Sequence, residues 1–180
     1  MGIGKVKRAV FLDRDGVLNL VVRRGAGIAS PRTLDEFQLT PGAADQVQRL
    51  KQAGFLTIVV TNQPDLSRGL LEPSHLERMH AHLSSCTRVD EILTCPHDDG
   101  DGCACRKPKP GLILDAAHRH GVDLGRSFMV GDSWKDMGAA KAAGVLGILI
   151  DTVYNQDVDC DCRVKSLQAA CGYIISNQCG

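Results

Sequence analysis

Residues 9–16 read Ala-Val-Phe-Leu-Asp-Arg-Asp-Gly, and this stretch decides the fold. Residues 9–12 are an apolar run of strand length, and Gly16 is a turn signal. Asp13 and Asp15 follow the run two residues apart, so in an extended chain their side chains leave on the same face. Two carboxylates beside a buried strand are costly unless a divalent cation lies between them or one holds a proton. Either arrangement indicates chemistry on an anionic substrate, although Asp-x-Asp-Gly alone is also typical of an ordinary turn.

Apolar runs and helix-like segments alternate along the rest of the chain. The pattern predicts further strands at 55–60, 91–94, 127–130 and 145–150, and helices at 41–53, from 73 onward, at 110–120 and at 134–143. Residues 17–40 are expected to form a long loop, and the tail a short helix near 165–170 and a terminal strand near 173–175. Apolar strands that alternate with helices predict an α/β protein with a doubly wound parallel sheet covered on both faces.

Polar residues follow three of the predicted strands directly. Asp13 and Asp15 follow the first, Thr61 the second and Asp132 the fourth. Ligands of such sheets bind outside the carboxyl ends of the strands, so these side chains are expected to meet at one edge. Asp132 can complete a Mg²⁺ site with the first carboxylates, and Lys107 offers an ammonium for phosphoryl oxygens. Taken singly, Thr61 could equally be a strand-end residue and Lys107 a solvated charge.

A second metal site is predicted between residues 95 and 105. Cys95, His97, Cys103 and Cys105 form the pattern Cys-x-His-x5-Cys-x-Cys. Three thiolates and one imidazole suit a closed, tetrahedral, structural zinc site. Zinc would stiffen a loop of Asp and Gly residues that has no core of its own. Cys160 and Cys162 form a weaker pattern, and we expect them to be unliganded.

Composition limits the possible partners. The chain has 180 residues, with 21 Lys plus Arg against 21 Asp plus Glu, so nothing indicates a polyanion or a membrane surface as partner. No apolar run reaches the roughly 18 residues that span a bilayer, and no signal peptide is evident. We therefore expect one domain over residues 1–180, a cytoplasmic location and, by default, a monomer.

Four motifs in order resemble those of the haloacid dehalogenase superfamily of phosphatases. They are Phe11-Leu12-Asp13-Arg14-Asp15-Gly16-Val17, Val60-Thr61-Asn62-Gln63, Cys105-Arg106-Lys107-Pro108 and Val130-Gly131-Asp132-Ser133-Trp134-Lys135-Asp136. The resemblance implies the Rossmann-like fold of that superfamily. The segments between the elements are too short for a cap domain, so a capless form with an inserted zinc loop is expected.

The resemblance also implies a role for each motif residue. Asp13 would be the nucleophile that forms an aspartyl-phosphate, and Asp15 the general acid and then base. Crowding beside Asp13 would keep Asp15 protonated for the first step. Thr61 and Lys107 would hold the phosphoryl group. Mg²⁺ would be bound by Asp13, the backbone carbonyl of Asp15 and Asp132, while Asp136 would orient Lys107 or a metal-bound water.

Two further stretches are Gln63-Pro64-Asp65-Leu66-Ser67-Arg68-Gly69 and the Cys95-Pro96-His97 start of the zinc loop. With them, the chain is most similar within the superfamily to the bacterial phosphatases that remove the 7-phosphate of D-glycero-D-manno-heptose 1,7-bisphosphate. That group acts in nucleotide-activated heptose biosynthesis, which supplies lipopolysaccharide. The similarity implies substrate contacts from Asn62, Gln63 and Arg106, with Arg106 and either Arg23 or Arg24 near the anomeric phosphate.

Three alternatives stay open at this point. The first is a histidinol-phosphate phosphatase or another small sugar-phosphate phosphatase, because the zinc loop is shared. The second, a polynucleotide 3′-phosphatase, is disfavoured because it should need a basic groove, which a net charge of zero does not indicate. The third is a zinc-stabilised binding module without catalysis.

Overall fold

A single parallel sheet organises the computed structural model, which describes residues 6–177. Its strand order is β5-β4-β1-β6-β7-β8. The strands are β1 (Arg8–Leu12), β4 (Phe55–Asn62), β5 (Glu91–Cys95), β6 (Phe128–Gly131), β7 (Leu146–Ile150) and β8 (Cys162–Val164). The chain moves outward from β1 to β5, returns to β6 beside β1, and then moves outward in the other direction. This reversal confirms the doubly wound α/β prediction and places a topological switch point between β1 and β6.

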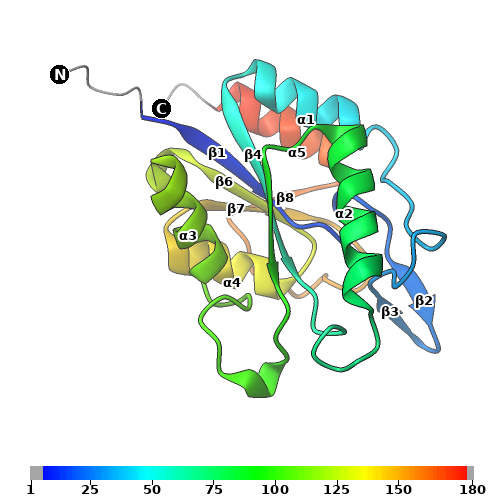
Figure 1. Ribbon diagram of the computed structural model, residues 1–180. Coiled ribbons are helices and arrows are strands. Elements are labelled where there is room, and N and C mark those ends of the chain that lie inside the picture. Colours follow the sequence, from blue (N-terminus) through cyan, green and yellow to red (C-terminus); the bar gives the residue numbers. More distant parts are fainter. Residues whose placement is uncertain (1–5, 178–180) are drawn as a thin grey trace.

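Helices cover both faces of the sheet (Figure 1). They are α1 (Ala43–Gln52), α2 (Pro73–Thr87), α3 (Gly111–His120), α4 (Trp134–Ala143) and α5 (Leu167–Ser176), with 3-10 turns at Asp99–Asp101 and Leu124–Arg126. Two apolar clusters show the layers. Val10 and Leu12 of β1 pack with residues of α1, α2 and α5, whereas Ala9 and Phe11 pack with residues of α3 and α4. The central strand is therefore apolar throughout, because both of its faces are buried.

The structure departs from the predicted elements in three places, the first of which is β8 (Cys162–Val164), a strand that was not predicted. Residues 17–40 contain an antiparallel hairpin, β2 (Val22–Arg24) with β3 (Gly27–Ala29), where a long loop was expected. The terminal strand predicted near 173–175 is wrong, because α5 runs through those residues. Leu167, Ala170 and Ile174 recur at helical spacing and are buried, and the Ser166 hydroxyl caps the helix by accepting from the Ala169 amide.

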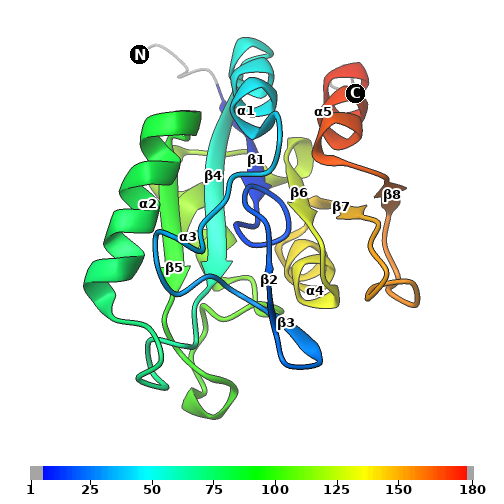
Figure 2. The same ribbon diagram turned by 90° about the vertical axis from the view of Figure 1, so that its right-hand side faces the viewer.

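Loops gather beyond the carboxyl ends of the strands, with the β2–β3 hairpin among them (Figure 2). The hairpin has only three residues in each strand, and it is the only sheet structure between β1 and α1 within the described part of the chain. The expectation of a fold without a cap domain is thereby confirmed. None of the helices within residues 6–177 is long and apolar enough to cross a membrane.

Candidate active site

A buried ammonium lies at the carboxyl edge of the sheet. The Nζ atom of Lys107 is 2.8 Å from Asp13 Oδ1, at the end of β1, and 2.6 Å from Asp136 Oδ1, on α4. Only 3% of the Lys107 side chain is exposed, and none of Asp136. Asn62 fixes the Lys107 backbone, because its amide donates to the carbonyl at 3.0 Å while its Oδ1 accepts from the Lys107 amide at 3.1 Å. Three segments far apart in sequence therefore converge on Lys107.

Asp132 brings a third carboxylate to the same place. Oxygen atoms of Asp13, Asp132 and Asp136 all lie within 4.8 Å of one another. Gly16 makes room for this arrangement: it has a φ of +81°, and a Cβ there would lie 2.0 Å from Asp132 Oδ2. The glycine of the first motif is thus required both by its left-handed backbone and by the close approach of Asp132.

The carboxylates raise one another's proton affinity. Burial, together with Asp136, raises the pKa of Asp13 well above its usual value, although Lys107 opposes the shift. Burial and Asp136 also raise the pKa of Asp132 to about 6. For Lys107, burial would lower the pKa, but Asp13 and Asp136 outweigh it and raise the value, so the ammonium is charged.

The donor set fits a hard divalent cation. Three clustered carboxylates face one ammonium, so two negative charges lack a partner when all three acids are ionised. Carboxylate oxygens are ligands that Mg²⁺ prefers. Asp13 and Asp132 could hold the ion, because the second carboxylate oxygen of Asp136 already accepts from the amide and hydroxyl of Ser133. Asp136 is thus placed to orient Lys107, one of the two roles expected for it.

Asp15 lies in a separate network of donors. Its Oδ1 accepts from Arg14 Nη2 at 3.0 Å and from Asn19 Nδ2 at 2.9 Å, and its Oδ2 accepts from Ser30 Oγ at 2.9 Å and Gln63 Nε2 at 2.8 Å. Burial alone would raise the pKa of Asp15, but Arg14 and the other donors outweigh it and leave the pKa below its usual value.

This environment corrects one expectation from the sequence. We expected crowding beside Asp13 to keep Asp15 protonated, whereas the structure raises the pKa of Asp13 and lowers that of Asp15. The reason is that four neighbouring side chains donate to the Asp15 carboxylate, and donors to the charged form favour that form.

Thr61 and Gln63 lie beneath this network. Both are fully buried, and the Gln63 amide donates to the Thr61 hydroxyl at 2.9 Å as well as to Asp15. Gln63 is absent from the residues that line the cavity described next, so the structure places it behind Asp15.

A cavity of about 500 Å³ opens over the acidic groups. It is lined by the expected residues Asp13, Asp15, Asn62, Arg106, Lys107 and Asp132, and also by side chains of the hairpin, of α4 and of the segment between β7 and β8. Arg106 is 7% exposed, and its guanidinium is held by Asp99 at 2.7 Å and by the carbonyl of His97 at 3.0 Å. Arg23 and Arg24 lie on the hairpin outside the lining residues, and Arg24 pairs with Glu36.

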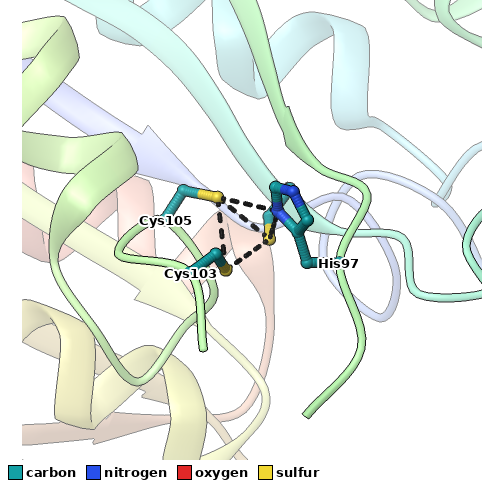
Figure 3. A group of neighbouring side chains, drawn as sticks. His97, Cys103 and Cys105 are labelled. Atoms are coloured by element: carbon teal, nitrogen blue, oxygen red, sulfur yellow. Dashed lines mark hydrogen bonds between the residues drawn. The ribbon is translucent and has the colours of Figure 1, made fainter. Parts of the chain in front are cut away.

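The predicted zinc ligands form one compact cluster (Figure 3). Cys105 Sγ lies 3.2 Å from Cys95 Sγ, 3.5 Å from Cys103 Sγ and 3.4 Å from His97 Nδ1, and Cys95 Sγ lies 3.7 Å from Cys103 Sγ. A tetrahedron with metal–sulfur bonds of about 2.3 Å has sulfur–sulfur edges of roughly 3.8 Å. The distances between the four ligand atoms are therefore close to those of a Cys3His zinc site.

A bound cation would also stabilise the thiolate form of these cysteines. Burial raises the pKa of the Cys95 thiol to about 12, so a positive charge is needed to hold it as a thiolate. Within residues 6–177, Cys160 and Cys162 do not belong to a group of three or more potential metal ligands. Cys179 lies outside the described residues.

The zinc loop is tied to the active site. Arg106 and Lys107 follow the last ligand, and Arg106 returns to the loop through Asp99 and His97. Arg68 forms two bonds of 2.6 Å with Asp98, which joins the segment after β4 to the same loop. The loop therefore holds Arg106, one of the residues that line the cavity, in place.

Three residues near the site were not predicted from the sequence. Tyr154 donates to the carboxylate of Asp132. Burial raises the pKa of the phenol, and the neighbouring Asp132 carboxylate raises it further. Asn155 donates to the Asp132 carbonyl at 2.8 Å. His80 has its Nε2 atom 3.2 Å from Nη1 of the fully buried Arg14. No local motif marks them, because each comes from a segment distant from the residue it contacts.

His80 should make stability depend on pH. Guanidinium groups only donate, so His80 Nε2 must accept and the ring must be neutral. Burial, and then Arg14, lower its pKa from 6.5 to about 4. The unfolded chain takes up this proton below its pKa of about 6.5, so stability falls as the pH drops toward 4, by up to about 3 kcal/mol.

Urea unfolding at several pH values checks this expectation with the variant His80→Gln, which keeps a neutral acceptor for Arg14. Between pH 6.5 and 4, the variant should lose less stability than the wild type. Parallel curves for the two proteins would show that folding does not lower the pKa of His80.

Removal of one zinc ligand should release the metal. Cys103→Ser should lower the zinc content, measured by plasma mass spectrometry, and the midpoint of thermal unfolding, because metal binding contributes to folding. Cys86→Ser, at an exposed cysteine on α2, is the matched control and should retain both. Equal zinc content in the two variants would exclude Cys103 from the site.

Comparison with known proteins agrees with this geometry. The D-glycero-beta-D-manno-heptose-1,7-bisphosphate 7-phosphatase of Pseudomonas aeruginosa is 40% identical over 148 residues, which cover 79% of this chain and 80% of that protein. The protein of the same name from Bordetella bronchiseptica is 41% identical over 150 residues, or 81% of each chain. The crystal structure of a D,D-heptose 1,7-bisphosphate phosphatase from B. bronchiseptica, complexed with magnesium and phosphate, is similar with a TM-score of 0.81 and 34% identity, covering 94% of this chain and 98% of that one.

The match to the haloacid dehalogenase-like hydrolases spans residues 7–144, from the start of β1 to the end of α4. It includes all four motifs and every residue of the acidic cluster. The chain therefore belongs to the haloacid dehalogenase-like hydrolase family.

Proposed function

We propose that this chain is a Mg²⁺-dependent phosphatase that removes the 7-phosphate of D-glycero-β-D-manno-heptose 1,7-bisphosphate through an aspartyl-phosphate on Asp13. The observation that carries the proposal is the convergence of Asp13, Asp132 and Lys107 beneath one cavity. The relatives named above support the substrate and the β anomer. The reaction would belong to the biosynthesis of nucleotide-activated heptose.

In the first step, a carboxylate oxygen of Asp13 attacks the phosphorus atom, and the bond from phosphorus to the C7 oxygen breaks. Asp15 protonates the leaving alkoxide. The Lys107 ammonium lies 2.8 Å from Asp13 Oδ1, so it can contact the phosphoryl group as that group arrives on Asp13. A bound Mg²⁺ would neutralise charge on the carboxylates and on the transferring oxygens.

In the second step, Asp15 acts as the base that removes a proton from water, and the water hydrolyses the aspartyl-phosphate. The donors around Asp15 suit this role, because they lower its pKa and hold the carboxylate ionised. For the first step Asp15 must take up a proton against these donors. The negative charge of a bound phosphate favours that uptake, since a nearby anion raises the pKa of a carboxyl group.

The cavity wall would select the substrate. Arg106 lines the cavity and is held by the zinc loop, so we assign it to the anomeric phosphate. Asn62 and Gln63 were expected to contact the sugar. Both amides already bind protein groups, Asn62 the Lys107 backbone and Gln63 the Asp15 carboxylate. We therefore assign them to positioning Lys107 and Asp15, with Asn62 also exposed to the cavity.

A panel of phosphate esters tests the substrate. With Mg²⁺, kcat/KM for the β anomer of heptose 1,7-bisphosphate should exceed that for the α anomer, fructose bisphosphate and histidinol phosphate. A tenfold difference corresponds to about 1.4 kcal/mol of transition-state binding. A higher value for histidinol phosphate would assign the enzyme to that substrate instead. Absence of phosphate release from every ester would indicate a binding module.

Replacement of the nucleophile tests the mechanism. Asp13→Asn should lower kcat by more than about 10³-fold, because an amide cannot form the acyl phosphate. Zinc content should be unchanged. Asp115→Asn, at a carboxylate of α3 that is 60% exposed, is the control and should retain full activity. Turnover of Asp13→Asn near the wild-type rate would refute the assignment of Asp13.

A further inference from the structure

The segment between β7 and β8 forms one wall of the active-site cavity. Tyr154, Asn155 and Val158 line the cavity, and all three lie beyond residue 144, where the family match ends. The segment is anchored at Asn155, which is 2% exposed. Its amide donates to the carbonyls of Asp132 and Ile150, each at 2.8 Å.

Two further bonds fix the conformation of this segment. The Thr152 amide donates to Asn155 Oδ1 at 2.9 Å, and the Arg163 guanidinium on β8 donates to the Val158 carbonyl at 2.7 Å. The segment is therefore held at both ends, and Tyr154 lies next to its most buried anchor.

Tyr154 directs its hydroxyl into the acidic cluster. The hydroxyl donates to Oδ2 of Asp132, while 43% of the residue remains exposed. Within residues 6–177, this is the one hydrogen bond donated to the Asp132 carboxylate, and Oδ1 receives none. Gly16 also packs against Oδ2, because a Cβ on this glycine would lie only 2.0 Å from that oxygen.

We propose that Tyr154 is a positioning residue that holds Asp132 for Mg²⁺. By occupying Oδ2, the hydroxyl fixes the orientation of the carboxylate and leaves Oδ1 for the ion. This inference rests on the proposed function, because it assigns Mg²⁺ to Asp13 and Asp132. It goes further by assigning a metal-affinity role to a residue outside the family motifs.

The expected effect follows from the energetics of groups that orient metal ligands. Loss of such a partner commonly costs about 10- to 100-fold in metal affinity, because the ligand must be ordered when the ion binds. The Tyr154 hydroxyl bonds to Asp132 and not to Asp13 or Lys107. Its loss should therefore lower the affinity for Mg²⁺, with a smaller effect on the rate of the reaction once Mg²⁺ is bound.

Tyr154→Phe tests the proposal, since it removes the hydroxyl and keeps the ring. Isothermal titration of the zinc-loaded protein with MgCl₂, in the absence of substrate, should give a dissociation constant raised at least about tenfold. The Mg²⁺ concentration for half-maximal activity should rise in parallel, while kcat at saturating Mg²⁺ is retained. Tyr173→Phe is the matched control, because Tyr173 is the other tyrosine of the chain and lies on α5 away from the cavity.

Each outcome decides the matter. An equal dissociation constant for Tyr154→Phe and Tyr173→Phe would overturn the inference, as would a lower unfolding midpoint with unchanged Mg²⁺ affinity. If the wild type itself bound no Mg²⁺, the proposed function would fail together with the inference. Phosphatase activity that is Mg²⁺-dependent in the wild type and unaltered in Tyr154→Phe would leave the proposed function intact and refute only the role of Tyr154.

Discussion

The buried contact between the Lys107 ammonium and the carboxylates of Asp13 and Asp136 is the interaction on which the rest of the site depends. An ammonium removed from water is stable only when oppositely charged groups surround it closely. Asp13 directly follows β1 and Asp136 lies in the first turn of α4, so the pairing fixes the relative positions of a strand, a helix and the loop that carries Lys107. The geometry of the proposed phosphoryl site is thus set by the same contacts that satisfy a buried charge.

The zinc loop also positions charged side chains, at a greater distance from the acidic cluster. It contains no large apolar residue between His97 and Cys103, so it cannot be ordered by a core of its own. Its four ligands nevertheless lie at nearly tetrahedral spacing, and the loop holds Arg106 and Arg68 by ion pairs. The metal would be structural by its coordination, and by ordering the loop it would help to hold Arg106 along the cavity wall.

The sequence predicted the sheet and the acidic cluster well, because both follow from local patterns. Apolar runs identify buried parallel strands, and polar residues directly after them must meet at one edge. The terminal strand was predicted wrongly because Tyr173-Ile174-Ile175 is a short apolar run, and its helical period is visible only when Leu167 and Ala170 are included. The protonation of Asp15 could not be predicted, since its pKa depends on Asn19, Ser30 and Gln63, which approach it only in the folded chain. Tyr154 and His80 were missed for the same reason.

The wall formed by residues 151–161 has a consequence for how relatives of this chain can diverge. The acidic cluster and Lys107 lie within residues 7–144, whereas part of the cavity lining comes from a segment after them. Because Tyr154 donates a hydrogen bond to Asp132, that segment also contacts the acidic cluster directly. With the role proposed for Tyr154, a chimera that received the corresponding segment of another phosphatase would change in its Mg²⁺ affinity as well as in the shape of its cavity.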